Sequence, residues 1–182
     1  IDFWPGEYSK TYVHAIKEHA DILDGIRQGR VFVTTGDLVS ELYVTVSQES
    51  AQAAMGGELL LEDGQLIEVL VRLKDPDNKN SAGRNPSVAR VDLIVGELTG
   101  LGKNLDRDEH KSVQVVKRFT RKNWKEKNGY TEMRHSLRLD GPSYLRVRGT
   151  NVAKELEPEP DKLGEDPWTD LWFYSNPVFI RR

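Results

Sequence analysis

Between Gln65 and Lys74 the chain reads QLIEVLVRLK, and this stretch decides the class of fold. Apolar and polar side chains largely alternate along it, which is typical of a β-strand with one buried face. Asp63-Gly64, just before it, is a strong turn signal. Together with Glu58–Glu62 on the other side of that turn, the stretch predicts a β-hairpin.

The same strand rhythm recurs along most of the chain, with polar, Asn-, Asp- or Pro-bearing segments between the repeats. Further strands are predicted over Ser9–Ala15, Val31–Thr34, Leu38–Ser47, Ala89–Leu98, Ser112–Thr120, Tyr130–Leu139, Tyr144–Arg148 and Leu171–Ile180. The last of these contains Pro177, so that residue is expected at an edge or a bulge.

One helix interrupts the strands, and it is predicted near the start of the chain. Ile22, Leu23 and Ile26 fall at helical spacing within Glu18–Gln28, and Gly29 stands where a helix C-cap belongs. The expected fold is therefore mostly β, an antiparallel β-sandwich of about seven to nine strands with one short N-terminal helix.

Composition excludes several classes of chemistry. The chain has 182 residues and no cysteine, so disulfides, thiolate metal sites and cysteine nucleophiles are ruled out. A net charge of −3 argues against general nucleic-acid binding, and no apolar run is long enough to span a membrane. The first methionine is Met55, so we expect the native amino terminus to lie upstream of Ile1; cytoplasmic and exported locations both remain open.

No catalytic or metal-binding motif stands out in the sequence. The four histidines form no His-Glu-x-x-His or His-x-His pattern, and no nucleophile elbow or phosphate loop is present. Asp75 and Asp77 have the spacing of calcium ligands, but Lys79 occupies the next alternate position. We therefore expect no metal ligand here, and a solvated loop in which Asn78 and Asn80 tolerate substitution.

Two arginines are the strongest candidates for contact with an anionic ligand. Arg146 and Arg148 alternate with apolar residues, which places both guanidinium groups on one face of a strand. Such a pair suits a phosphate or carboxylate, because the planar fork of arginine matches those groups. Ion pairing with acidic residues of the chain itself is the favoured interpretation.

Aromatic and basic clusters give two further hypotheses. Trp168, Trp172 and Tyr174 could form a carbohydrate-binding platform, although burial in the core is the favoured interpretation. The segment 117–127 combines basic residues with Phe119 and Trp124, as some nucleic-acid-binding surfaces do; a hairpin with a charged outer face is favoured there.

A resemblance to a known family rests on both ends of the chain. DFWPGEY (2–8) followed by KTYV (10–13) resembles the exit segment of a PHP domain, the catalytic domain of the polymerase and histidinol phosphatase superfamily of metal-dependent phosphoesterases. DGIRQGR (24–30) and VFVTTGD (31–37) resemble the helix and strand that follow it. YLRVRG (144–149) and WFYSNPVF (172–179) resemble the closing strands.

The resemblance implies that residues 1–30 are the tail of a catalytic domain (loop, strand and helix) and that residues 31–182 are a C-terminal accessory β-sandwich. The family's metal ligands lie upstream of the exit segment, so divalent ions are expected in the parent's catalytic domain and not in this chain. The implied partner is that N-terminal domain, with Trp4, Glu7, Tyr8 and Tyr12 near the contact. The alternative from another class is a carbohydrate- or surface-binding module.

This chain by itself is predicted neither to hydrolyse phosphoesters nor to retain divalent metal, because it lacks the ligand motifs. Elemental analysis of the dialysed protein should find no stoichiometric zinc, manganese or iron. One or more ions bound per chain would overturn the prediction.

Overall fold

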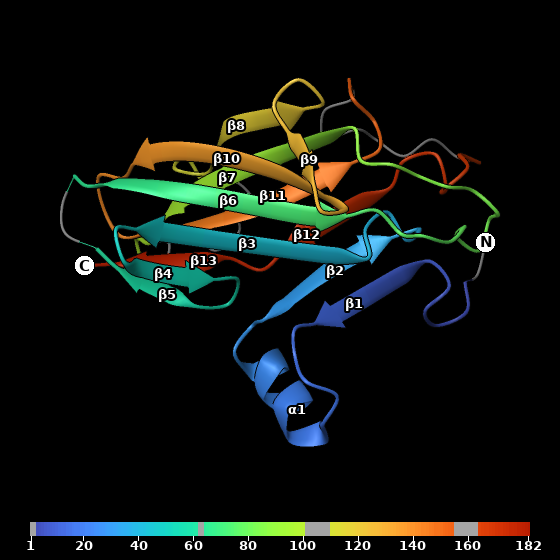
Figure 1. The fold of residues 1–182 in the computed structure, drawn as a ribbon, viewed down its shortest axis with the longest axis horizontal. Helices are drawn as coiled ribbons and strands as arrows, with labels where there is room; N and C mark the ends of the chain where they lie inside the picture. Colours follow the sequence, from blue (N-terminus) through green and yellow to red (C-terminus); the bar gives the residue numbers. More distant parts are fainter. Residues whose placement is uncertain (1–2, 62–63, 101–109, 155–163) are drawn as a thin grey trace.

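The alternation in QLIEVLVRLK is confirmed in strand β6 (Leu66–Lys74) of the computed structural model, where Ile67, Val69, Val71 and Leu73 are buried. The structure describes residues 3–61, 64–100, 110–154 and 164–182. Two sheets packed face to face form the predicted β-sandwich (Figure 1), and within these ranges all strand pairs but one are antiparallel.

Sheet B has five strands in the order β4-β3-β6-β10-β9. Their bounds, besides those of β6, are β3 (Glu41–Gln48), β4 (Ala51–Ala54), β9 (Lys125–Lys127) and β10 (Tyr130–Arg138).

Sheet A has eight strands, and β11 (Ser143–Thr150) lies at its centre. β11 pairs with β7 (Arg90–Glu97) along one side and with both β12 (Trp172–Ser175) and β13 (Val178–Arg181) along the other. The remaining strands are β1 (Ser9–Val13), β2 (Val31–Thr35), β5 (Glu58–Leu60) and β8 (Gln114–Thr120).

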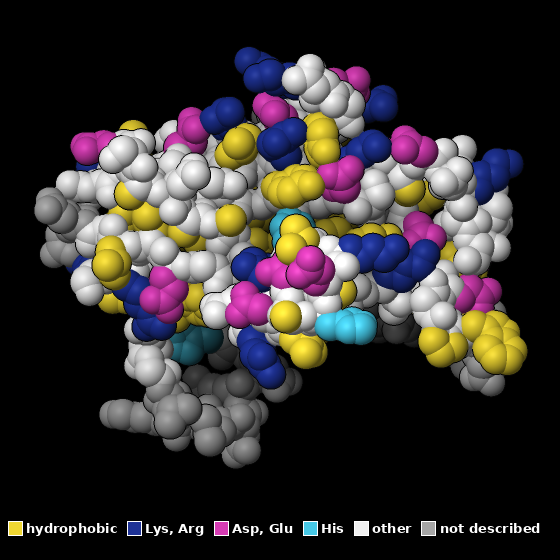
Figure 2. Space-filling view, turned by 60° about the horizontal axis from the view of Figure 1, so that its bottom comes forward, with side chains coloured by type: hydrophobic (Ala, Val, Ile, Leu, Met, Phe, Trp, Pro, Cys, Tyr) yellow, Lys and Arg dark blue, Asp and Glu magenta, His cyan; other side chains and the backbone are white. Residues whose placement is uncertain are grey.

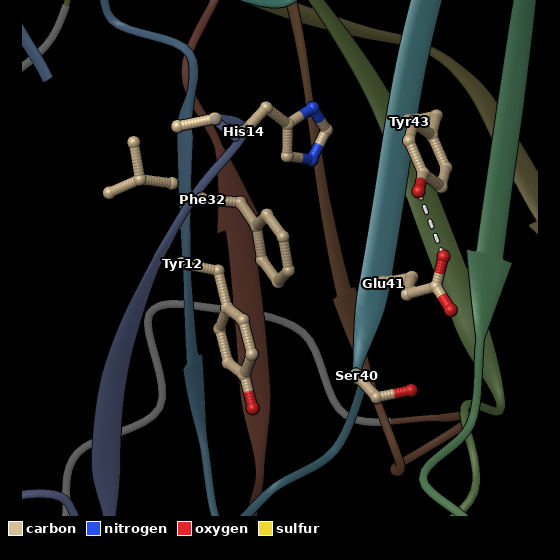
Figure 3. A pocket seen from close by; sticks show the side chains of 8 residues that line it. Tyr12, His14, Phe32, Ser40, Glu41 and Tyr43 are labelled. Carbon is tan, nitrogen blue, oxygen red and sulfur yellow. Dashed lines mark hydrogen bonds between the residues drawn. The ribbon is translucent and has the colours of Figure 1, made fainter. Parts of the chain in front are cut away.

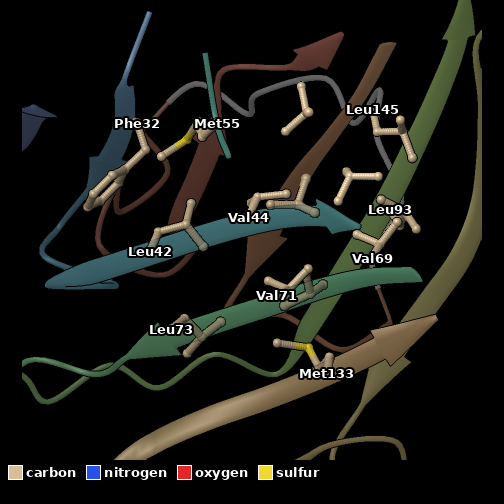
Figure 4. Packing of buried hydrophobic residues seen from close by; sticks show 14 of the residues in the cluster. Phe32, Leu42, Val44, Met55, Val69, Val71, Leu73, Leu93, Met133 and Leu145 are labelled. Carbon is tan, nitrogen blue, oxygen red and sulfur yellow. The ribbon is translucent and has the colours of Figure 1, made fainter. Parts of the chain in front are cut away.

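The core lies between the inner faces of the two sheets (Figure 4). Val69 and Val71 of β6 point toward Leu93 of β7 and Leu145 of β11, and all four are at most 1% exposed. Burying such side chains stabilises a fold by about 25 cal/mol per Å² of apolar surface removed from water. This contact therefore fixes which face of each strand is available for anything else.

The predicted helix is present as α1 (His19–Arg27), and Gly29 follows its C-cap with a positive φ of 71°. β1, just before α1, pairs with β2 over five residues and forms an edge of sheet A. The expected tail, residues 1–30, is thus partly built into the sheet, whereas α1 stands away from the sandwich (Figure 1).

The predicted hairpin at Asp63-Gly64 is wrong. β5 pairs in parallel with β13 of sheet A, whereas β6 lies in sheet B, so the connection crosses from one sheet to the other. Gly64 does adopt the positive φ of a turn residue, 71°. A turn signal specifies that the chain reverses locally, but the pairing partners are chosen by packing elsewhere.

The strand expected over Leu171–Ile180 is two strands, β12 and β13, separated by Asn176-Pro177. At this break the Asn176 N–H donates to the Val31 oxygen of β2 and its side-chain amide to the Gly29 oxygen, both at 3.1 Å, while the Pro177 oxygen accepts from the Gly56 N–H at 2.9 Å. This break and short strands such as β4 and β9 raise the count to thirteen among the described residues, above the predicted range.

The expectation that Asn80 lies in a solvated loop is also wrong. Its side chain is buried and donates to the Gly36 oxygen at 3.0 Å. The same side chain accepts from the backbone N–H groups of Ala82 and Arg84 at 3.1 and 3.0 Å. Asn80 therefore fastens the loop after β6 to the end of β2.

Replacing Asn80 with alanine should destabilise the chain by about 2 kcal/mol, because three hydrogen bonds are lost and the oxygen of the buried Gly36 loses its side-chain donor. Asn78→Ala, at an exposed position two residues away, is the matched control and should change stability by less than about 0.5 kcal/mol. Urea unfolding measures both. Equal midpoints for the two variants would contradict the role given to Asn80.

Candidate functional site

Helix α1 presents apolar side chains to solvent. Its one buried residue is Gly25, and a Cβ there would lie 2.6 Å from the Val13 side chain of β1, so the helix packs closely by its backbone. Leu23 and Ile26 on the helix are 52% and 53% exposed, and Ile16 before it is 64% exposed. Figure 2, turned so that this side comes forward, shows hydrophobic side chains standing among charged ones.

Ionic and backbone contacts hold α1 in place despite this slight packing. Arg30 lies 3.0 Å from Asp24 and 3.4 Å from Asp21, and the Asp21 carboxylate accepts from the Ile16 N–H at 2.6 Å. The Arg30 N–H donates to the Gly25 oxygen at 2.8 Å. The exposed apolar residues are therefore presented on a fixed element.

Among the four residues predicted near a domain contact, three are engaged within the chain itself. The Tyr8 ring stacks on Phe3 with the centroids 4.6 Å apart, and it meets the Trp168 ring edge-on with the centroids 5.2 Å apart. Tyr12 stacks on Phe32, with the ring centroids 4.9 Å apart.

Glu7 accepts from the backbone N–H of Trp4 at 2.9 Å, whereas the Trp4 side chain is left 81% exposed. Of the predicted contact residues, Trp4 is the one that offers a large apolar surface to a partner.

The predicted arginine pair lies on the outer face of sheet A, and Arg148 is engaged in an ion pair. Its Nε lies 3.3 Å from the Asp92 carboxylate. Asp92 is 1% exposed and also meets Arg118 at 2.7 Å and Arg90 at 3.7 Å. Ion pairing, the favoured interpretation, is thus what the structure shows for Arg148. Arg146 is half-buried on the same face, two residues away along β11.

The three residues of the proposed aromatic platform do not form one group. Trp172 and Tyr174 stack at 6.1 Å on the outer face of sheet A, with Arg148 lying 5.6 Å from the Trp172 ring. Trp172 is only 9% exposed, and Trp168 packs instead with Phe3 and Tyr8. Phe173, on the opposite face of β12, belongs to the core.

The basic segment 117–127 is not a hairpin, because β8 lies in sheet A and β9 in sheet B. Phe119 is 1% exposed and Trp124 packs against the core. Neither ring is therefore placed to stack on a nucleic-acid base.

The structure contains a hollow of about 390 Å³ that the sequence did not predict. It lies between β1 and β2 of sheet A and the start of β3 in sheet B, and Figure 3 shows it from close by. Its lining residues are Tyr12, Val13, His14, Ala15, Phe32, Ser40, Glu41 and Tyr43. These residues come from three strands and their flanking segments, so no local motif marks the site.

Electrostatics in this hollow centre on Glu41. Tyr43 and Tyr130 both donate to its Oε2 atom, at 2.8 and 2.7 Å. Those hydrogen bonds, that of Tyr130 first, hold the pKa of the Glu41 carboxyl below its usual range, and the carboxylate in turn raises the pKa of Tyr43 to about 12. Burial lowers the pKa of His14, so its imidazole is neutral at pH 7.

Within the part of the chain that the structure describes, no cluster of three or more His, Asp or Glu side chains is arranged to hold a metal ion. No helix among the described residues is long and apolar enough to cross a membrane. Comparison with protein-family models, with curated proteins and with solved structures gives no match to this chain.

Replacing Asp92 with asparagine should destabilise the chain by about 3 kcal/mol, because buried guanidinium charge loses its compensating carboxylate. Asp77→Asn is the control; its side chain is 80% exposed beside Lys74, and its loss should cost less than about 1 kcal/mol. Thermal unfolding of both proteins checks this. The network would be structurally unimportant if Asp92→Asn melted like the wild type.

Proposed function

We propose that this chain is the C-terminal accessory β domain of a PHP-type metal-dependent phosphoesterase. It packs on the catalytic domain, shapes one wall of the site and is not catalytic alone. The metal ions and the metal ligands belong to the catalytic domain, which precedes this chain. The observation that carries the proposal is helix α1, an element held by ionic and backbone contacts on which Leu23 and Ile26 remain more than half exposed.

The exposed apolar residues fit a docking surface for a domain that precedes Ile1. Trp4 lies before β1 in the chain, whereas Ile16, Leu23 and Ile26 lie after it, so the two groups stand on either side of one edge strand in the sequence. Trp4 and β1 lie within residues 2–13, the part of the chain that resembles the PHP exit sequence. An interface core is typically formed by such aliphatic and aromatic side chains surrounded by charged ones.

The rival function, carbohydrate binding on an aromatic platform, has less support. Trp172 is nearly buried under arginine side chains, and Trp168 is part of a separate cluster with Tyr8. Flat rings exposed side by side, which stacking on a sugar needs, are not formed by Trp168, Trp172 and Tyr174.

The double variant Leu23→Ser/Ile26→Ser tests the proposal in the longer protein that includes the residues before Ile1. Losing two apolar side chains that the proposed interface covers should weaken domain docking by about 3 kcal/mol. Metal-dependent hydrolysis of a nitrophenyl phosphoester should fall, and the catalytic domain should melt separately from the β domain. The same substitutions should leave the melting temperature of this chain alone nearly unchanged, because both side chains are already half exposed.

Leu60→Ser/Leu66→Ser is the matched control, since these leucines are 73% and 52% exposed and belong to β5 and β6 and not to α1. It should leave activity and domain melting as in the wild type. Docking through α1 is refuted if both double variants behave alike. The enzyme class is refuted if no His-x-His or Asp-x-His motif precedes Ile1.

A further inference from the structure

The hollow between β1, β2 and β3 has one charged lining residue, Glu41. Tyr43 and Tyr130 occupy one carboxylate oxygen, Oε2, while no described residue donates a hydrogen bond to the other, Oε1. Two hydrogen bonds thus fix the orientation of the carboxylate, and Oε1 remains able to accept a hydrogen bond from a ligand. In Figure 3 the Glu41 and Tyr43 side chains lie across the hollow from Tyr12 and Phe32.

The other rings of the hollow are neutral and form a connected series. Tyr12 stacks on Phe32. The centroid of the His14 ring lies 5.9 Å from that of Phe32 and 5.0 Å from that of Tyr43. The negative faces of such rings attract cations. Tyr43 is 38% exposed, so part of its ring remains accessible to a ligand.

The neighbouring cations are already compensated by acidic residues. Arg72 lies 4.3 Å from the centroid of the Tyr130 ring and 5.8 Å from that of the Tyr43 ring, and it is 3.1 Å from Glu132. Lys74, opposite Glu41 in the register of β3 and β6, lies 3.2 Å from Asp77. Arg30 pairs with Asp21 and Asp24 on the side of α1. Glu41 is therefore the one charged residue that lines the hollow, and each of these neighbouring cations also pairs with another carboxylate.

We propose that this hollow binds an organic cation, a guanidinium or primary ammonium group, which donates to Oε1 of Glu41 and lies against the ring of Tyr43. A phosphate or carboxylate ligand would be repelled by Glu41. A sugar ring has no flat platform here, because Phe32 is 2% exposed and is covered by Tyr12. The hydrogen bonds from the two tyrosines orient the carboxylate before a ligand arrives, which lowers the ordering cost of binding.

The cation can be a free small molecule or a basic side chain of a domain docked beside β1. Both sources use the same chemistry, and binding to this chain alone does not depend on the proposed docking of α1. Failure of one proposal therefore leaves the other standing.

Titration of the chain with agmatine, followed by the NMR signals of His14 and Tyr43, tests the site. Saturable shifts are expected, and Glu41→Gln should weaken binding at least about tenfold by removing the charge. Glutamine keeps an oxygen that can accept from both tyrosines, so the local fold should persist. Tyr43→Phe keeps the ring and should bind within a few-fold of the wild type, whereas Tyr43→Leu should bind more weakly.

Glu68→Gln is the matched control, because Glu68 carries the same charge at the far end of β6 and pairs with Arg134. It should bind agmatine like the wild type. No saturable shift in the wild type, or equal affinities for Glu41→Gln and Glu68→Gln, would overturn the inference. In the longer protein, agmatine that still binds identifies a free ligand as the source; a site already occupied identifies a side chain of the docked domain.

Discussion

The burial of two sheet faces against each other is the constraint on which the rest of the structure depends. Alternate residues of β6 and β3 meet alternate residues of β7 and β11, and most apolar side chains of these strands are used there. Because side chains alternate along a strand, this contact also decides which residues point outward. The charged network of Asp92 and the exposed ring of Tyr43 are both consequences of it.

At the edges of the sandwich the same constraint leaves surface uncovered. β1 extends sheet A beyond the main overlap with sheet B, and the hollow beside Glu41 opens between them. Helix α1 follows β1 and lies still farther out (Figure 1). A helix of nine residues is marginal by itself, so the contacts of Arg30 with Asp21 and Asp24 help to keep it formed. Apolar residues on such an element favour a role in docking.

The outer face of sheet A carries arginines on neighbouring strands, and their charges need an acidic partner. Asp92 lies between Arg118 and Arg148 in the cross-strand register, so one carboxylate compensates guanidinium groups from both sides. On the same face the guanidinium groups of Arg90 and Arg148 each lie 5.6 Å from the centroid of the Trp172 ring. This arrangement explains why Arg90 and Asp92 of β7 are as buried as its apolar residues.

The sequence by itself determined the features that depend on neighbouring residues: the strand alternation, the short helix and its glycine cap, and the presence of an arginine pair on one strand face. It could not determine the partners of β5 and β6, the break at Pro177 or the burial of Asn80. Nor could it reveal the hollow around Glu41, to which residues between Tyr12 and Tyr130 contribute. Alternation and caps arise from backbone geometry over a few residues, whereas strand partners, buried polar contacts and cavities arise from contacts between distant segments, which only the tertiary structure brings together.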